Sequence, residues 1–182
     1  MSDTRDHLKS IATDQICKNN LAAASFREMG KVAGIKSSSV HYHFKSRDAL
    51  LLELATDYQQ AFFTELQQRT DGISSPRQRL QHLCDLYMDH FSSNGQCLAQ
   101  AYSAGMNELT EDSLTAIQAF YDALYEWVLD CLSSARFLPV SREALARVVV
   151  SSLQGAMVAD RVRPDTPHLE SVREWLGTLT SL

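Results

Sequence analysis

A short polar segment, residues 36–43, carries the side chains best suited to contact nucleic acid. Three consecutive serines, Ser37 to Ser39, are followed by His41, Tyr42 and His43. Short hydroxyl side chains approach base edges closely, and histidine and tyrosine reach phosphate oxygens. Three serines in a row are poor helix formers that add no packing, so the chain gives up local stability there. The pattern favours a helix that reads DNA over one that is only solvated.

The thiol of Cys97 is a second candidate for chemistry. It follows residues 94–96, Asn-Gly-Gln, at the predicted start of a helix, where the helix dipole lowers the pKa of a thiol. A small buried hydrophobe is the favoured interpretation, and a thiol that senses oxidants or electrophiles is the alternative. The other cysteines lie on apolar stripes, where we expect them in the core: Cys17, Cys84 and Cys131.

Enzymatic chemistry has little support in this sequence. It contains no nucleophile motif and no glycine loop that would cradle phosphates. His82, Asp85 and Asp89 share a helical face and make at most a weak metal site. We therefore predict no catalytic residue, no metal and no cofactor.

Apolar residues recur at the helical period along almost the whole chain. The clearest stripe has the spacing i, i+3, i+4, i+7 and i+11, and consists of Leu80, Leu83, Cys84, Tyr87 and Phe91. No segment shows a convincing period of two. We therefore predict an all-α protein of nine helices, three short ones within the first 45 residues and six after them.

Two of the short helices are joined by a tight turn. Residues 26–33 and 37–43 flank Gly34, which we expect to adopt the left-handed conformation that ends a helix. Ile35 is placed to fill the corner between the two helices. This spacing predicts a helix-turn-helix, in which the second helix enters the major groove of DNA.

The formal net charge of -5 conceals an uneven distribution. Residues 1–50 hold eight lysines and arginines against five acids, whereas residues 51–182 hold nine against 17. A basic segment joined to an acidic one indicates two functions in one chain. Neither a signal peptide nor an apolar run long enough for a membrane span is present, so we expect a cytoplasmic protein.

The helix-turn-helix residues closely resemble the N-terminal domain of TetR/AcrR-type bacterial transcriptional regulators. Residues 26–35 supply the first helix and its Ala-Gly-Ile turn. Residues 39–50 supply the histidine-rich and aromatic end of the recognition helix and the following F-x-x-R-D-x-L pattern. Two positions depart from the family: Gly30 stands where alanine is usual, and His41 where tyrosine is usual.

The resemblance implies a DNA-binding helix-turn-helix domain of three helices, residues 1–46, and a six-helix domain for ligand sensing and dimerisation, residues 47–182. Its partners would be a double-stranded DNA operator, a small-molecule effector and a second copy of the chain. The implied base contacts come from Arg27, Ser37, Ser38 and Ser39. The implied phosphate contacts come from Ser25, Lys36, Tyr42, His43 and Arg47.

Two uncharged stretches, residues 91–107 and 148–159, indicate helices buried in a bundle that suits a ligand pocket. For each pocket candidate the alternative is ordinary core packing. Asp160 and Arg161 follow the second stretch. Three alternatives are open for them: they line the polar end of the pocket, they pair across a dimer interface, or they are simply exposed. The other candidates are Tyr87, Phe91, Tyr102, Met106, Phe120, Tyr121, Tyr125, Gln154 and Met157.

The last two helices are predicted to form a homodimer of two-fold symmetry. The first of them presents small side chains that allow close helix approach: Val149, Ser152, Gly155, Ala156 and Ala159. The second presents an apolar seam: Leu169, Val172, Leu176 and Leu179. We predict a ligand-responsive repressor that binds a palindromic operator as a dimer and is released by a small molecule or electrophile. A redox sensor acting through Cys97 and a helical adaptor that binds protein are the alternatives.

Overall fold

A computed structural model describes residues 2–135 and 140–179, and within these ranges the chain forms nine α-helices, three short 3₁₀ helices and no strand. The predicted all-α class is therefore confirmed. The first helix is not short, however, because it contains 17 residues. The α-helices are α1 (Ser2–Lys18), α2 (Phe26–Ala33), α3 (Ser37–His43), α4 (Arg47–Thr70), α5 (Pro76–Asn94), α6 (Leu98–Ala104), α7 (Glu111–Cys131), α8 (Arg142–Val162) and α9 (His168–Leu179). The 3₁₀ helices are η1 (Leu21–Ala23), η2 (Met106–Glu108) and η3 (Leu132–Ser134).

The chain divides into two compact units, each assembled from two segments. The first unit comprises Met1–Gln60 and Gln96–Ala119, and the second comprises Ala61–Gly95 and Phe120–Leu182. Helices α4 and α7 each supply residues to both units. The boundary after Ser46 remains a prediction about function, because these units describe packing alone.

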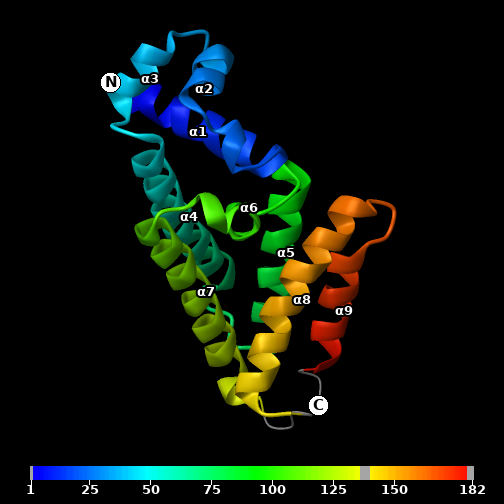
Figure 1. Ribbon diagram of the computed structural model, residues 1–182. Coiled ribbons are helices and arrows are strands. Elements are labelled where there is room, and N and C mark those ends of the chain that lie inside the picture. Colours follow the sequence, from blue (N-terminus) through cyan, green and yellow to red (C-terminus); the bar gives the residue numbers. More distant parts are fainter. Residues whose placement is uncertain (1, 136–139, 180–182) are drawn as a thin grey trace. The chain divides into compact units, whose positions relative to one another are not determined.

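In the first unit, α1, α2 and α3 pack together as the three-helix arrangement that the spacing predicted (Figure 1). Ser25 begins α2 as its N-cap, because its Oγ accepts a hydrogen bond from the Glu28 N–H at 3.2 Å. Gly34 ends α2 with a φ of 68°, in the left-handed region expected for this glycine. Apolar side chains of all three helices are buried in this core, among them Leu8, Phe26, Met29 and Val40.

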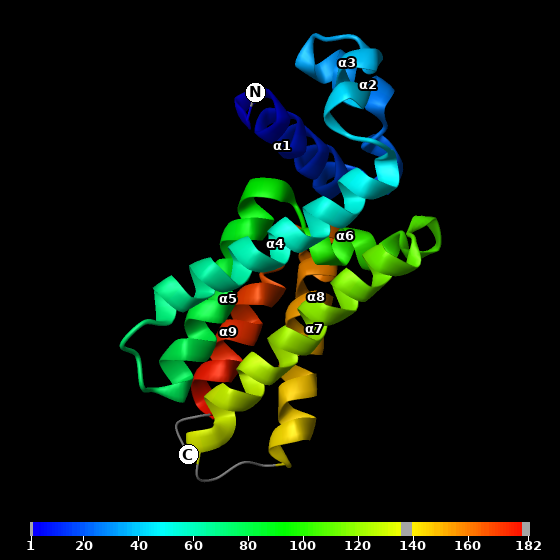
Figure 2. The ribbon, with the colours of Figure 1, turned by 90° about the vertical axis from the view of Figure 1, so that its left-hand side faces the viewer.

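In the second unit, α9 packs against both α5 and α8 (Figures 1 and 2). Helix α5 begins with Pro76 in its first turn and with Ser75 as N-cap, as the sequence signals predicted. An aromatic cluster fills the core of this unit. Phe62 meets Tyr87 and Phe120 edge to face, with ring centroids 5.7 and 5.2 Å apart.

Asp160 fixes the start of α9. Its carboxylate is 5% exposed and accepts hydrogen bonds from the main-chain N–H groups of His168 at 2.7 Å and Leu169 at 3.0 Å. The His168 Nδ1 lies 2.7 Å from the same carboxylate. The expectation that Asp160 is simply exposed was wrong, because the side chain is buried and its oxygens satisfy the unpaired donors of a helix N-terminus.

Candidate nucleic-acid interface and effector site

Helix α3 presents polar side chains to solvent and anchors itself through one apolar residue. Val40 is fully buried, whereas Ser38 and Ser39 are exposed and Tyr42 is 75% exposed. Lys36, which precedes the helix as its N-cap residue, is exposed too. The remaining two candidates of this segment are half-buried: Ser37 and His43. Hydroxyl groups and a cation are therefore available along the outer face of the predicted recognition helix.

The other two candidates for DNA contacts, Ser25 and Arg27, lie at the start of α2. Arg27, in the first turn of α2, is exposed. A guanidinium in such a position can donate to O6 and N7 of one guanine at the same time. The Ser25 hydroxyl accepts from the Glu28 N–H, so its own proton is left to donate to a phosphate oxygen.

The departure from the family at His41 has a structural reason. The His41 ring meets the buried Phe26 ring edge to face, with centroids 4.5 Å apart. Its imidazole therefore helps to pack α3 onto α2. The neighbouring Tyr42 is 75% exposed.

The departure at Gly30 also has a structural reason. A Cβ atom at this position would lie 2.9 Å from the Ile35 carbonyl oxygen and 3.3 Å from the Ser37 nitrogen. The Ile35 N–H donates to the Gly30 carbonyl at 2.9 Å, so the turn closes directly on this residue. The glycine therefore permits the close approach of α2 to the start of α3.

Arg47 begins α4, as expected, but its side chain is engaged within the protein. Its Nη2 donates to the Leu21 carbonyl at 2.6 Å and lies 3.1 Å from the Glu108 carboxylate. These contacts tie the start of α4 to η1 and η2. They give Arg47 an internal partner for its charge, so we base no DNA contact on this residue.

Residues 96–119 pack onto α1 and α4 within the first unit. The Gln96 Nε2 donates to the Cys17 carbonyl at the end of α1, at 2.9 Å. The Tyr102 hydroxyl donates to the Leu51 carbonyl of α4, at 2.8 Å. Tyr102 is fully buried, whereas Met106 is 53% exposed. These two pocket candidates thus belong to the first unit, and the remaining nine lie in the second.

In the second unit, one polar pair stands among the buried aromatic residues. The Gln154 Nε2 of α8 donates to the Tyr87 hydroxyl of α5 at 2.8 Å, and Tyr87 and Met157 are fully buried. The guanidinium carbon of Arg147 lies over the Tyr125 ring, 5.8 Å from the ring centroid. The remaining candidates range from half-buried to exposed: Phe91 and Tyr121 are half-buried, and Arg161 is exposed.

An apolar groove of about 470 Å³ runs between α8 and α9 on the surface of the second unit. Its walls include Ser152, Gly155, Ala156 and Ala159, which the sequence assigned to a dimer interface. From α9, Val172 and Trp175 contribute the opposite wall. Along α8, three exposed valines continue the apolar surface: Val148, Val158 and Val162.

All four cysteines are buried. Burial raises the pKa of Cys84 and of Cys131 to about 12, so both thiols remain protonated. Cys97 is the N-cap residue of α6, and its Sγ accepts from the Gln100 N–H at 3.4 Å. Its predicted position at a helix start is confirmed, but its side chain has little access to solvent.

The face of α5 that carried the weak metal hypothesis is occupied by ion pairs. Arg173 Nε donates to Asp85 at 2.5 Å, and Arg69 lies 2.8 Å from Asp89. Within the described ranges, no group of three or more histidine, cysteine and acidic side chains is placed to hold a metal ion. The carboxylates of this face therefore neutralise arginines.

The sequence did not single out a charged cluster on α1 and α4. Arg5 and Lys9 of α1 contact Glu53 and Asp57 of α4. The signal available in the sequence was the i, i+4 spacing of each pair, which places both members on one helical face. Nothing in the sequence could indicate that the two faces meet.

Comparisons with known proteins concern both sequence and fold. No protein-family model matches the chain. The HTH-type transcriptional repressor KstR2 of Mycolicibacterium smegmatis is 33% identical over 89 residues, which cover 49% of this chain and 42% of the relative. The repressor of the same name from Mycobacterium tuberculosis is 28% identical over 83 residues, 46% of this chain and 42% of the relative. The match therefore spans less than half the length of these curated relatives.

Solved structures resemble the chain over nearly its whole length. A TetR transcriptional regulator from Legionella pneumophila is 23% identical and superposes with a TM-score of 0.88, covering 98% of this chain and 97% of that one. A TetR-family regulator from Agrobacterium tumefaciens is 20% identical with a TM-score of 0.91, and 98% of each chain is covered. At these identities the likeness shows the fold. In the parts of the chain that the structure describes, no helix is long and apolar enough to cross a membrane.

Proposed function

We propose that this chain, which has the fold of the TetR family of transcriptional regulators, is a repressor that reads its DNA operator with α3. The observation that carries the proposal is the outer face of α3, where serines and Tyr42 are exposed on a helix-turn-helix. The sequence similarity to HTH-type repressors supports the same function.

The proposed contacts follow from exposure and donor chemistry. Base edges would be read by Arg27 and by the serines of α3: Ser37, Ser38 and Ser39. Phosphates would be bound by Ser25, Lys36, Tyr42 and His43. Phosphate contacts determine the register of the protein on DNA, and base contacts determine which sequence it prefers.

A homodimer is the proposed binding form. The groove between α8 and α9 and the valines beside it form an apolar surface that a second copy would cover. Two-fold symmetry would present two α3 helices to a palindromic operator, with half-sites about 34 Å apart or a multiple of this spacing.

The proposed effector is a small molecule that binds in the second unit. Tyr87 and Gln154 supply a hydrogen-bonding pair among Phe62, Phe120 and other apolar groups. Other pocket residues would be Phe91, Tyr121, Tyr125, Met157 and Arg161. The effector would release DNA by binding the DNA-free conformation more tightly, and a preference of about 100-fold corresponds to about 2.7 kcal/mol.

The proposal assigns residues 1–46 to DNA binding and residues 47–182 to ligand sensing and dimerisation. It also describes a cytoplasmic protein without catalytic activity. Helix α4 is continuous from Arg47 to Thr70 and supplies residues to both units, so it is the proposed path of the signal.

The proposal is tested by the salt dependence of binding to duplex DNA from the region upstream of the protein's own coding sequence. Fluorescence anisotropy should detect binding whose affinity falls steeply with salt, by about 10³-fold or more between 50 and 200 mM if six or more phosphates are contacted. Binding that is absent at low salt, or independent of salt, would instead favour a protein-binding adaptor.

A further inference from the structure

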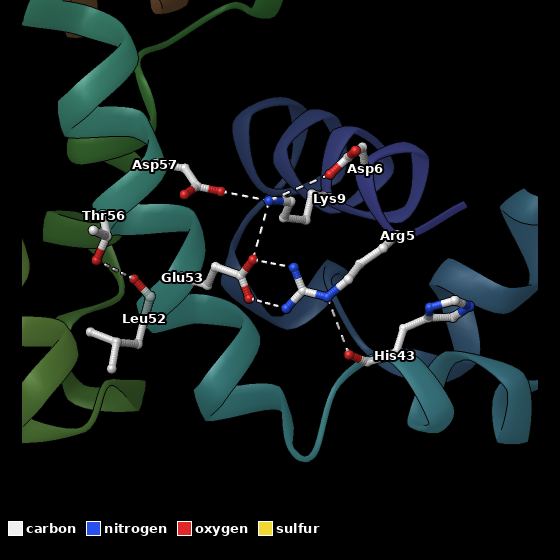
Figure 3. A network of polar contacts seen from close by, with 8 residues as sticks. All are labelled: Arg5, Asp6, Lys9, His43, Leu52, Glu53, Thr56 and Asp57. Atoms are coloured by element: carbon white, nitrogen blue, oxygen red, sulfur yellow. Dashed lines mark hydrogen bonds and ion pairs between the residues drawn. The ribbon is translucent and has the colours of Figure 1, made fainter. Parts of the chain in front are cut away.

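An ion-pair network joins α1 to α4 within the first unit (Figure 3). The Arg5 guanidinium donates from both of its Nη atoms to the two oxygens of Glu53. Lys9, one turn further along α1, donates to Glu53 at 3.1 Å and to Asp57 at 2.8 Å. The two cations thus face two carboxylates that are one turn apart on α4.

Arg5 also contacts the end of the proposed recognition helix. Its Nε donates to the main-chain carbonyl of His43, the last residue of α3, at 3.5 Å. Its guanidinium carbon lies 4.8 Å from the ring centroid of Phe44, the residue that ends α3. Figure 3 shows the guanidinium lying between the Glu53 carboxylate and the His43 carbonyl. Because the last carbonyls of a helix carry partial negative charge, a cation stabilises that end.

Helix α3 packs against α2 at its start, where Ser37 approaches Gly30, and through the contact of His41 with Phe26. It is seven residues long, and Val40 is its one buried residue. Phe44 is buried immediately after it. A side chain that contacts both the last carbonyl of α3 and the Phe44 ring therefore adds a second anchor, at the C-terminal end of this short helix.

The charges of the cluster argue against a direct role in phosphate binding. Glu53 and Asp57 offset Arg5 and Lys9, and Asp6 lies 3.7 Å from the Lys9 ammonium. The bond from Arg5, aided by Lys9 and opposed by burial, holds the pKa of Glu53 below its usual range, so this carboxylate stays ionised. The cluster has no excess of positive charge to offer DNA.

We propose that Arg5 and Glu53 are positioning residues for DNA reading. Glu53 on α4 holds the Arg5 guanidinium, and Arg5 holds the end of α3, so the pair fixes the angle at which Ser38, Ser39 and Tyr42 meet the major groove. The inference rests on the proposed function of α3, and it adds two residues that make no contact with DNA themselves.

Replacing Glu53 by glutamine separates positioning from simple electrostatics. Glu53→Gln removes a negative charge and keeps the shape of the side chain, so electrostatics alone predicts tighter binding to every DNA. Positioning predicts weaker binding to the preferred sequence, since a neutral amide releases the Arg5 guanidinium. The two explanations therefore predict opposite signs for one substitution.

The test compares variants on two duplexes by fluorescence anisotropy: one selected by the wild-type protein from a random library, and a scrambled duplex of equal composition. Glu53→Gln and Arg5→Gln should each lower affinity for the selected duplex by about 10-fold or more, which corresponds to about 1.4 kcal/mol. Affinity for the scrambled duplex should change by less than about 2-fold, which corresponds to about 0.4 kcal/mol. The matched control is Lys9→Gln, which breaks α1–α4 ion pairs and whose polar partners are Asp6, Glu53 and Asp57. This variant should leave the preference between the duplexes unchanged.

Three results would overturn the inference. The first two are equal or tighter binding of Glu53→Gln to the selected duplex, and a loss of preference in Lys9→Gln as large as that in Arg5→Gln. The third is a fall of about 0.9 in the slope of log affinity against log salt concentration for Arg5→Gln, which would mean that Arg5 contacts a phosphate directly. Circular dichroism verifies that each variant folds, and if Arg5→Gln does not fold, Glu53→Gln decides alone. If the wild-type protein selects no duplex, the proposed function itself fails, and this inference fails with it.

Discussion

At Gly30 two physical effects of one methyl group oppose each other. In a helix, alanine is more favourable than glycine by about 1 kcal/mol, so propensity predicts that Gly30→Ala stabilises α2. The added Cβ would, however, lie 2.9 Å from the Ile35 carbonyl oxygen, and main-chain atoms have little room to move. Overpacking of this kind costs about 1–3 kcal/mol.

We expect the steric effect to prevail at this position. Gly30→Ala should lower the free energy of unfolding by about 1 kcal/mol, measured by urea denaturation. Ala61→Gly, at an exposed position inside α4, is the control for propensity alone and should also destabilise. Opposite signs for the two variants would show that the close contact at Gly30 is absent.

Arg27 is the side chain expected to contribute most to base discrimination. Arg27→Ala should weaken binding to the selected duplex by about 1–3 kcal/mol and relax its sequence preference. Lys31→Ala is the matched control, because Lys31 is an exposed cation one turn further along α2 and is not among the proposed contacts. An equal, sequence-independent loss in both variants would reduce Arg27 to a contributor of charge.

Local signals sufficed for some residues and failed for others. Ser25 and Gly34 were predictable because an N-cap and a left-handed C-cap depend on a few neighbouring residues. Arg47 and Arg5 were not, since their partners Glu108 and Glu53 are distant in the sequence and only the packed unit brings them close.

On the scale of an element, α9 depends on Asp160 for its first turn. Burial by itself would raise the pKa of Asp160, but hydrogen bonds from Leu169 and His168 outweigh it and hold the pKa below the usual range. A carboxyl group with a depressed pKa stabilises the fold above its unfolded value, about 3.9, and this contribution disappears as pH falls through the folded value.

Asp160→Asn should therefore lower the free energy of unfolding by about 1 kcal/mol at pH 7, the usual effect of losing a helix cap. The difference from the wild type should shrink below about pH 4, as measured by urea denaturation across pH. Asp165→Asn, an exposed carboxylate in the preceding loop, serves as the control. A difference that persists unchanged at low pH would show that the charge of Asp160 is not what holds α9.

Helix periodicity predicted the elements because each helix buries one stripe, as Leu80, Leu83 and Tyr87 do on α5. The groove between α8 and α9 was harder to predict, because a helical stripe does not say what it packs against. Tyr102 illustrates this, since its hydroxyl is bound to the Leu51 carbonyl of the first unit.

On the scale of the whole molecule, the family resemblance of the helix-turn-helix is confirmed by the fold, and dimerisation remains the decisive proposal. Gly155 lines the α8–α9 groove, and a Cβ atom there would meet nothing within 4 Å in its own protomer. Gly155→Arg should therefore leave the protomer folded and abolish the dimer, as measured by analytical ultracentrifugation. Thr64→Arg adds the same charge at an exposed site on α4 and should leave the dimer intact. A Gly155→Arg variant that still sediments as a dimer would move the interface to another face.

Selection of duplex DNA from a random library by the purified wild-type protein, read by sequencing, tests the proposed repressor most directly. A two-fold symmetric reader predicts an enriched palindrome whose half-sites are centred about 10 base pairs, or a multiple of this, apart. Enrichment of no sequence at all, or of a single half-site without symmetry, would contradict the dimeric reading of DNA by α3.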